Sequence, residues 1–332
     1  LQQQNKSTMK FNSKLNLTVT VFAFLAIAYG SNPVVAQDPE FTQFYANPMY
    51  LNPAFAGSEQ TGRIGINYRN QWAAIDHPFR TFSASYDTYA KNLSGGLGIQ
   101  FVNDGAGAGT YHSNSISGIY AYHATLSRKY RLHVGTKVGY SEKSINWDEL
   151  TFADMLDPDQ GFVYASSEQQ PMKSRGYLDL SAGALVYSKN MFAGIAVSHL
   201  HEPITSLVGD DKLLRRYTFH GGTNIKMGDK LKGTYTLSPN ILYTKQGEFQ
   251  QLNLGMYLHS GVITAGVWYR STDAIILLFG IKTPKFSLGY SYDMTISRLT
   301  MESGGAHEIS FIVKIPQKTG RRNYQQIPCA AF

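Results

Sequence analysis

Histidine and serine residues stand at a few places where they could do chemistry. His112 directly precedes Ser113, a pair that could suggest a serine activated by histidine. Successive residues on a strand point to opposite faces, so these two side chains should diverge. His199 and His201 would share a face at a strand end, but a third metal ligand is not visible. The spacing therefore favours structural roles for all four residues.

Other motif patterns also point away from catalysis. Neither Gly-x-Ser-x-Gly nor His-Glu-x-x-His occurs in the chain. Residues 105–109 are rich in glycine but lack the lysine and spacing of a phosphate-binding loop, so we interpret them as a flexible turn. Asp154, Asp157 and Asp159 lack the later glutamate of a calcium loop, which favours a solvated acidic loop. We expect a protein that is not an enzyme and needs no cofactor or metal.

The first 36 residues have the order of a secretory signal peptide. Lys10 and Lys14 give a basic start, residues 15–28 an apolar core, and residues 34–36 a small-residue cleavage site before Gln37. The apolar run is short for a membrane anchor. These residues hold three lysines and no acid, so the rest carries 27 basic and 23 acidic residues. That balance is too even to predict nucleic-acid binding, and a single cysteine, Cys329, excludes an internal disulfide.

Between residues 63 and 315 the chain alternates between apolar and polar residues. Ile64, Ile66 and Tyr68, for example, alternate with Gly65 and Asn67. About fourteen such segments occur, most near the 9–11 residues that a tilted membrane strand needs. With 22 Tyr, 31 Gly and only 16% charged residues, this pattern predicts an all-β fold: a closed antiparallel transmembrane β-barrel in the outer membrane. A soluble sandwich of shorter strands is the alternative.

The predicted connections alternate between short and long. Residues 127–130 and 188–190 are tight turns, whereas residues 146–175, 201–214 and 299–305 are long. An even strand number places both ends of the barrel on the periplasmic side, and all the long connections then fall outside.

The longest connection, residues 146–175, has six acidic and two basic residues. It also holds Trp147, Phe152, Phe162 and Tyr164, residue types that serve as anchors at interfaces. We interpret it as a partner-binding loop; a merely solvated loop is the alternative.

The segment before the first strand, residues 37–62, is unusually rich in aromatic residues for a linker. Asn47-Pro48 and Asn52-Pro53 are paired turn signals, because proline fixes its own φ and restricts the residue before it. Phe55 follows, and Gly57 precedes the predicted strand that ends near Arg69 and Trp72. We interpret the segment as a plug or collar packed at one end of the barrel, the alternative being an ordinary loop. Residues 316–332 form a basic tail.

Two stretches carry a family resemblance. Residues 43–57 (QFYANPMYLNPAFAG) with Arg69-Asn-Gln-Trp72 resemble the opening of the PorP/SprF family of the type IX secretion system. Residues 289–297 (GYSYDMTIS) and 303–309 (SGGAHEI) resemble its last hairpin.

The resemblance implies an outer-membrane barrel that helps deliver or hold secreted proteins, often adhesins with a type B C-terminal sorting domain, and in many members a link to gliding motility. Expected partners are these secreted proteins, other secretion components including a candidate periplasmic peptidoglycan-binding protein, and outer-membrane lipid. The barrel pattern alone would favour a diffusion or uptake porin. The two functions differ in the lumen, because a porin needs an open channel.

Overall fold

The computed structural model describes residues 38–59, 61–157, 161–162, 164, 166, 172–228, 235–271, 273–296, 304–316 and 327–328. Residues 35–332 form one compact unit. The predicted signal peptide, Asp159 and Cys329 lie outside the described residues. No helix in these ranges is long and apolar enough to cross a membrane.

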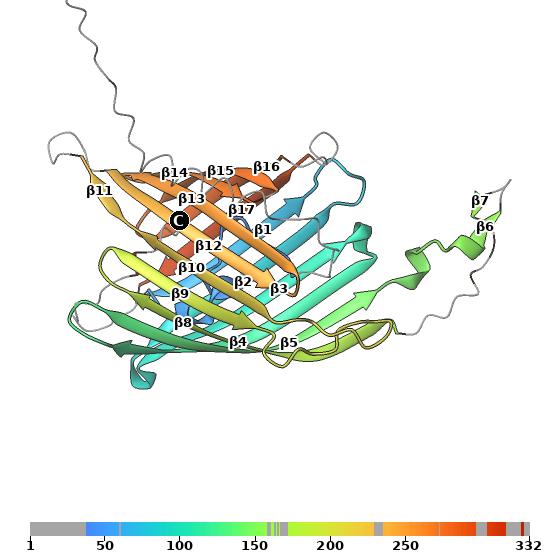
Figure 1. Cartoon of the computed structure of the whole chain (residues 1–332), viewed down its shortest axis with the longest axis horizontal. Helices are drawn as coiled ribbons and strands as arrows, with labels where there is room; N and C mark the ends of the chain where they lie inside the picture. The colour runs from blue at the N-terminus through green and yellow to red at the C-terminus, as the bar shows by residue number, and fades with distance from the viewer. Residues whose placement is uncertain are drawn as a thin grey trace, which may run out of the picture. The chain divides into compact units, whose positions relative to one another are not determined.

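Fourteen strands form one antiparallel sheet that closes on itself (Figure 1). They are β1 (Gly62–Gln71), β2 (Phe79–Ala90), β3 (Gly95–Ala106), β4 (Tyr111–Thr125), β5 (Arg131–Ile145), β8 (Ser174–Tyr187), β9 (Met191–Ser198), β10 (Arg216–Thr223), β12 (Tyr235–Gln246), β13 (Phe249–Ser260), β14 (Ile263–Arg270), β15 (Ala274–Lys282), β16 (Phe286–Thr295) and β17 (Ala306–Ile315). The predicted fold class and strand number are confirmed.

The barrel is closed by pairing between the first and last strands. Gly62 pairs with Ile315 and Gln71 with Ala306, so β1 and β17 are in register over their full lengths. One of the alternating segments, residues 215–227, does not form a continuous strand: β10 ends at Thr223, and β11 (Ile225–Met227) continues the pairing with β12. A separate two-stranded sheet, β6 (Leu156–Asp157) and β7 (Gly161–Phe162), lies within the long connection between β5 and β8.

The two faces of the barrel wall differ as the alternation predicts. On β1, Ile64, Ile66 and Tyr68 face outward and are 38–41% exposed, whereas Asn67 and Arg69 face inward and are buried. The same outward-apolar pattern recurs around the barrel, which suits a surface in contact with hydrocarbon.

The connections between strands are divided between the two ends of the barrel, and the longest of them, residues 146–173 and 199–215, lie at the same end. One end, here the loop end, carries residues 72–78, 107–110, 146–173, 199–215, 247–248, 271–273 and 296–305. The other, the turn end, carries residues 91–94, 126–130, 188–190, 228–234, 261–262 and 283–285. All the long connections share one end, as predicted. Short 3-10 helices lie in several of them: η2 (Lys91–Leu93), η3 (Gly107–Gly109), η4 (Trp147–Glu149) and η5 (Ala153–Met155).

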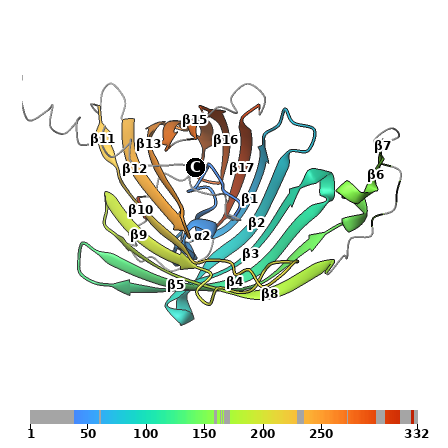
Figure 2. The ribbon, with the colours of Figure 1, turned by 45° about the vertical axis from the view of Figure 1, so that its right-hand side comes forward.

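The N-terminal segment, residues 38–59, lies inside the barrel (Figure 2). It contains a single helical turn, α2 (Pro48–Leu51), and a 3-10 turn, η1 (Pro53–Phe55), each with proline at its start. Asp38 contacts residues at the loop end, and Gly57 contacts Asp87 near the turn end. The expectation of a collar at one end is therefore wrong: the segment runs along the lumen from one end to the other.

Candidate functional site

At the loop end a buried ionic network holds the start of the N-terminal segment. Glu308 on β17 accepts hydrogen bonds from the backbone N–H groups of Thr42 (2.5 Å) and Gln43 (3.2 Å). The Thr42 hydroxyl donates to Asp293 on β16 at 2.8 Å. Arg69 pairs with Asp293 at 2.9 Å and with Glu308 at 3.6 Å. A buried carboxylate is costly unless it is paired and hydrogen-bonded, and both conditions hold here.

Arg270 on β14 completes this network. Its Nη1 lies 3.1 Å from Asp293 Oδ2, so that carboxylate lies between two guanidinium groups. Removing one member of such a network leaves the others buried and unpaired, which costs more than the lost contact itself.

In the middle of the lumen, apolar side chains form a core between the segment and the wall. Phe44 packs edge-on against Trp268 at a centroid distance of 5.2 Å, and Tyr45 packs against Phe192 at 5.6 Å. Phe55, which is 1% exposed, stacks on His220 at 5.4 Å. Ile327 of the C-terminal tail packs against the same cluster of side chains.

Asn52 shows why the second Asn-Pro pair shapes the segment. Its side-chain oxygen accepts from the N–H of Ala54 (2.9 Å) and caps η1. Its Nδ2 donates to the carbonyls of Ala184 (3.2 Å) and Ile195 (3.1 Å) on the wall. One side chain therefore fixes the local turn and anchors it to two strands. Asn47 plays a similar part, because it donates to Ser83 and accepts from Gln100.

At the turn end a second ion pair holds the C-terminal end of the N-terminal segment. The N–H of Gly57 donates to Asp87 at 2.8 Å, and the Arg63 guanidinium binds the same carboxylate at 2.7 Å. Gly57 has φ 62°, a left-handed conformation that glycine adopts without a steric penalty.

Several wall glycines face the segment and leave room for its backbone. A Cβ added at Gly135 would lie 2.4 Å from the nitrogen of Ala54, and one at Gly96 would lie 2.0 Å from the oxygen of Ala56. A Cβ at Gly183 would lie 2.1 Å from the Asn52 side-chain oxygen. The segment and the wall therefore meet backbone to backbone, which explains glycines in the middle of strands.

His199 joins the first residues of the segment to the barrel mouth. Its Nε2 lies 2.7 Å from Asp38 Oδ2 and its Nδ1 lies 2.9 Å from Asp179 Oδ1. Burial disfavours the charged ring, but the two carboxylates outweigh it and raise the pKa of His199 to about 9. Burial likewise opposes ionisation of Asp38, yet His199 and Arg216 hold the pKa of Asp38 well below its usual value.

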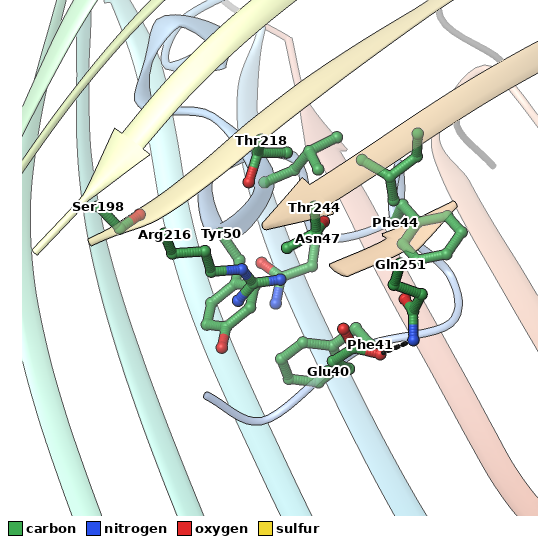
Figure 3. Close-up of a pocket in the computed structure, with 12 residues that line it drawn as sticks. Glu40, Phe41, Phe44, Asn47, Tyr50, Ser198, Arg216, Thr218, Thr244 and Gln251 are labelled. Carbon is green, nitrogen blue, oxygen red and sulfur yellow. Dashed lines mark hydrogen bonds between the residues drawn. The ribbon is translucent and has the colours of Figure 1, made fainter. Parts of the chain in front are cut away.

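Arg216 and Tyr50 lie next to this group. The Arg216 guanidinium lies over the Tyr50 ring, 5.8 Å from its centroid, and both line a small cavity in the lumen (Figure 3). Across that cavity, Glu40 accepts a hydrogen bond from Gln251 (3.1 Å; Figure 3).

The predicted loop residues have different surroundings. Trp147 is buried; its indole N–H donates to the carbonyl of Met172 at 2.8 Å, and its ring stacks on Phe152. Trp147 thus ties together the two ends of the 146–173 connection. Phe162 lies in β7, with its side chain outside the described residues, and Tyr164 is 55% exposed.

Arg69 and Trp72 also have different surroundings. Arg69 belongs to the buried network, as described above. Trp72 lies beyond the end of β1 at the loop end, where its N–H donates to the carbonyl of Gly305 at 2.7 Å and its ring packs on Phe79. The sequence grouped both with the N-terminal segment; Arg69 donates a hydrogen bond to its Thr42, whereas Trp72 bonds to Gly305 and packs on Phe79.

The chemical motifs considered from the sequence do not assemble into a site. His112 and Ser113 are successive residues of β4, and Ser113 faces a lumenal cavity. His199 is buried in its ion pairs, whereas His201 is exposed. In the part of the chain that the structure describes, no cluster of three potential metal ligands occurs.

Sequence reasoning missed the carboxylates that hold the segment, namely Asp87, Asp293 and, as a functional residue, Glu308. A signal for them existed. All three occupy inward positions of strands whose other face is apolar, where a charge needs a partner inside the barrel.

No curated protein matches the chain at a significant level. Among solved structures, Omp33 of Acinetobacter baumannii is 8% identical with a TM-score of 0.43, over 79% of this chain and 100% of its own. CdiB from Acinetobacter baumannii is 8% identical with a TM-score of 0.43 (77% and 60%), and the KdgM porin 9% identical with a TM-score of 0.35 (77% and 99%). The family model described as type IX secretion system membrane protein PorP/SprF matches residues 34–313. The chain therefore belongs to the PorP/SprF family of type IX secretion system membrane proteins.

Proposed function

We propose that this outer-membrane barrel is a non-enzymatic anchor that helps deliver or hold secreted proteins at the cell surface. Its clients are adhesins with type B C-terminal sorting domains, and in a gliding cell the same retention supports motility. The barrel cooperates with other secretion components, including a periplasmic peptidoglycan-binding protein at the turn end. The signal peptide directs the chain to export and is removed before Gln37.

The observation that carries this proposal is the occupied lumen. Residues 41–47 and 52–56 are all buried, and they bond to the wall from Glu308 near the loop end to Asp87 near the turn end. An open diffusion porin, the alternative, needs a water-filled channel along this path. A barrel whose interior is filled by its own chain is better suited to hold a partner on its ends.

The loop end offers the surface for a secreted partner. The 146–173 connection is acidic, and within it Leu156 (51%) and Tyr164 (55%) are exposed. Acidic charges steer encounter with a basic partner, while exposed apolar side chains provide contact area. The buried Trp147–Met172 contact closes the base of the loop, so residues beyond it can be removed without opening the barrel.

The test is deletion of residues 152–170, with deletion of residues 206–211 in the neighbouring loop as the matched control. Surface-labelled cells and culture medium are probed for the adhesin, and heat-modifiable gel mobility reports barrel assembly. We expect the first deletion to release the adhesin into the medium while the barrel assembles, and the control to retain it. Normal retention in the first deletion would remove this loop from the mechanism and leave the N-terminal segment as the candidate.

The porin alternative has its own measurement. Single-channel recording in planar bilayers should show little steady conductance from the intact barrel. A large, constant conductance would instead favour diffusion or uptake as the function.

A further inference from the structure

The loop-end half of β8 has a neighbouring strand on only one side. On one side β8 pairs with β5 along its whole length, from residue 174 to residue 187. On the other side only residues 182–187 pair with β9, so β8 continues past the end of β9 (Figure 1). Residues 174–179, here the β8 edge, therefore form an open sheet edge at the loop end of the barrel.

The polar backbone groups of β8 point alternately to its two sides. The carbonyl of Lys173 accepts a hydrogen bond from the N–H of Ile145 on the β5 side at 3.0 Å. The carbonyl of Leu180 accepts from the N–H of Leu200 on the opposite side at 2.9 Å. Even-numbered residues of the β8 edge therefore direct their N–H and C=O groups away from β5. In the part of the chain that the structure describes, these groups have no hydrogen-bond partner at three residues: Ser174, Gly176 and Leu178.

The β8 edge is open because the chain turns inward directly after β9. His199 has φ 57°, a left-handed conformation that residues other than glycine rarely adopt. Its ion pairs with Asp38 and Asp179 hold the ring on the lumenal side. The connection that follows reaches the inner face of β5, where the Thr205 hydroxyl accepts a hydrogen bond from the Lys143 ammonium at 3.3 Å. The residues that could have continued β9 beside the β8 edge therefore lie elsewhere.

The β8 edge can be reached from outside the membrane. β8 has 14 residues, more than the 9–11 that a tilted strand needs to cross the hydrocarbon. Counted from Tyr187 at the turn end, such a span ends near Tyr177. Native sheet edges are usually protected by lysine, proline or a bulge, but the outward positions here are Ser174, Gly176 and Leu178. The Leu178 side chain is 62% exposed, so the edge is open to another polypeptide.

We propose that the β8 edge binds an extended segment of a secreted protein by strand addition, through the free backbone groups of Gly176 and Leu178. Main-chain hydrogen bonds give such a complex its affinity, and alternate side chains give it specificity. The 146–173 connection, which leads into β8, has six acidic residues and one basic, so a segment with basic side chains is favoured. A second copy of this chain would bring two such acidic connections together, and like charges oppose that pairing. The inference deepens the proposed function and rests on it for the identity of the client.

The test in cells compares Leu178→Pro with Leu178→Thr as the matched control. Proline removes the N–H that points to the open side and leaves the pairing with β5 intact, whereas threonine keeps that N–H. With barrel assembly checked by heat-modifiable mobility, Leu178→Pro should release about tenfold more adhesin into the medium than Leu178→Thr. Equal release by the two variants would overturn the proposal. A strain without the whole barrel tests the proposed function separately, because it should release the adhesin whichever part of the barrel holds it.

A second test uses the unaltered protein in detergent and does not depend on the folding of a variant. The probes are acetyl-Arg-Val-Thr-Val-Arg-Val-amide, the same peptide with every backbone nitrogen methylated, and a copy with glutamate in place of arginine, all followed by saturation-transfer NMR. The methylated and glutamate peptides should bind at least about tenfold more weakly than the first. Equal binding of the first and methylated peptides, or no binding of the first at millimolar concentration, would overturn the proposal. A dimer of the barrel that is lost in Leu178→Pro would overturn it too, by assigning the edge to a second copy.

Discussion

The wall glycines offer a direct way to displace the N-terminal segment. Gly135→Ala would place a Cβ 2.4 Å from both Ala54 N and Pro53 C, so this contact must open by about 1 Å to reach ordinary distance. Overpacking of this kind costs about 1–3 kcal/mol. Sliding the segment away would also strain the Asn52 bonds to Ala184 and Ile195, each contributing about 1 kcal/mol. We expect docking to weaken by about 3 kcal/mol, roughly a hundredfold in the undocked population.

Chymotrypsin can measure that population, because the segment holds Phe41, Phe44 and Tyr45 in buried positions. When opening is fast relative to cleavage, the cleavage rate follows the undocked fraction. The matched control is Gly118→Ala, on the outward face of β4, where an added Cβ meets no atom within 4 Å. Equal cleavage of Gly135→Ala and Gly118→Ala in the segment, mapped by mass spectrometry, would refute the close backbone contact.

Three further results are expected. Phe55→Ala should cost about 3–5 kcal/mol and reduce the folded fraction seen as heat-modifiable mobility; unchanged mobility in both Phe55→Ala and Phe44→Ala would make the segment a free tail. The His199 pKa is raised to about 9 from its ordinary 6.5, so its contribution, up to about 3 kcal/mol, is complete below pH 6.5 and lost as pH rises through 9. Because the pKa of Asp38 is lowered, its carboxylate stays ionised and able to pair with His199 down to acidic pH. The rate of cleavage at Phe41, normalised to that of a free peptide at each pH, should rise between pH 7 and 10. A rate that does not change with pH and equals that of His199→Gln would contradict the ion pair between His199 and Asp38. N-terminal sequencing of the membrane-extracted protein should begin near Gln37, and recovery of an intact N-terminus containing Lys10 would contradict cleavage.

The barrel could be predicted because period-two alternation is a local property. Ile64, Ile66 and Tyr68 report one lipid-facing side without knowledge of their neighbours in space. The strand break at Asn224 was not predicted, because the alternation by itself does not show where pairing stops. The end of the barrel at which each connection lies follows from the order of the strands. The position of the long connections could therefore be predicted together with the strands.

The site was predicted less completely because its contacts join residues far apart in sequence. Asn52, Phe55 and Gly57 were identified through local turn chemistry and aromatic content, and they do lie in the segment that contacts the wall. Their partners, such as Glu308 and Asp87, depend on which inward position faces which part of the segment. Trp147 was expected to act as an anchor for a partner, yet its type alone does not reveal the internal bond to Met172.

The direction of the N-terminal segment constrains the order of assembly. It descends from Asp38 near the loop end to Gly57 near the turn end, and β1 then returns, so the two form a hairpin with one arm in the lumen and one in the wall. Thr42 and Glu308, which join that arm to the last strand, are 266 residues apart. If β1 and β17 had already paired, the N-terminal arm would have to thread into the closed barrel, past the side chains at the barrel's opening. The simpler route lays the arm against the open sheet and seals the seam last, so a late and slow closing step belongs to this topology.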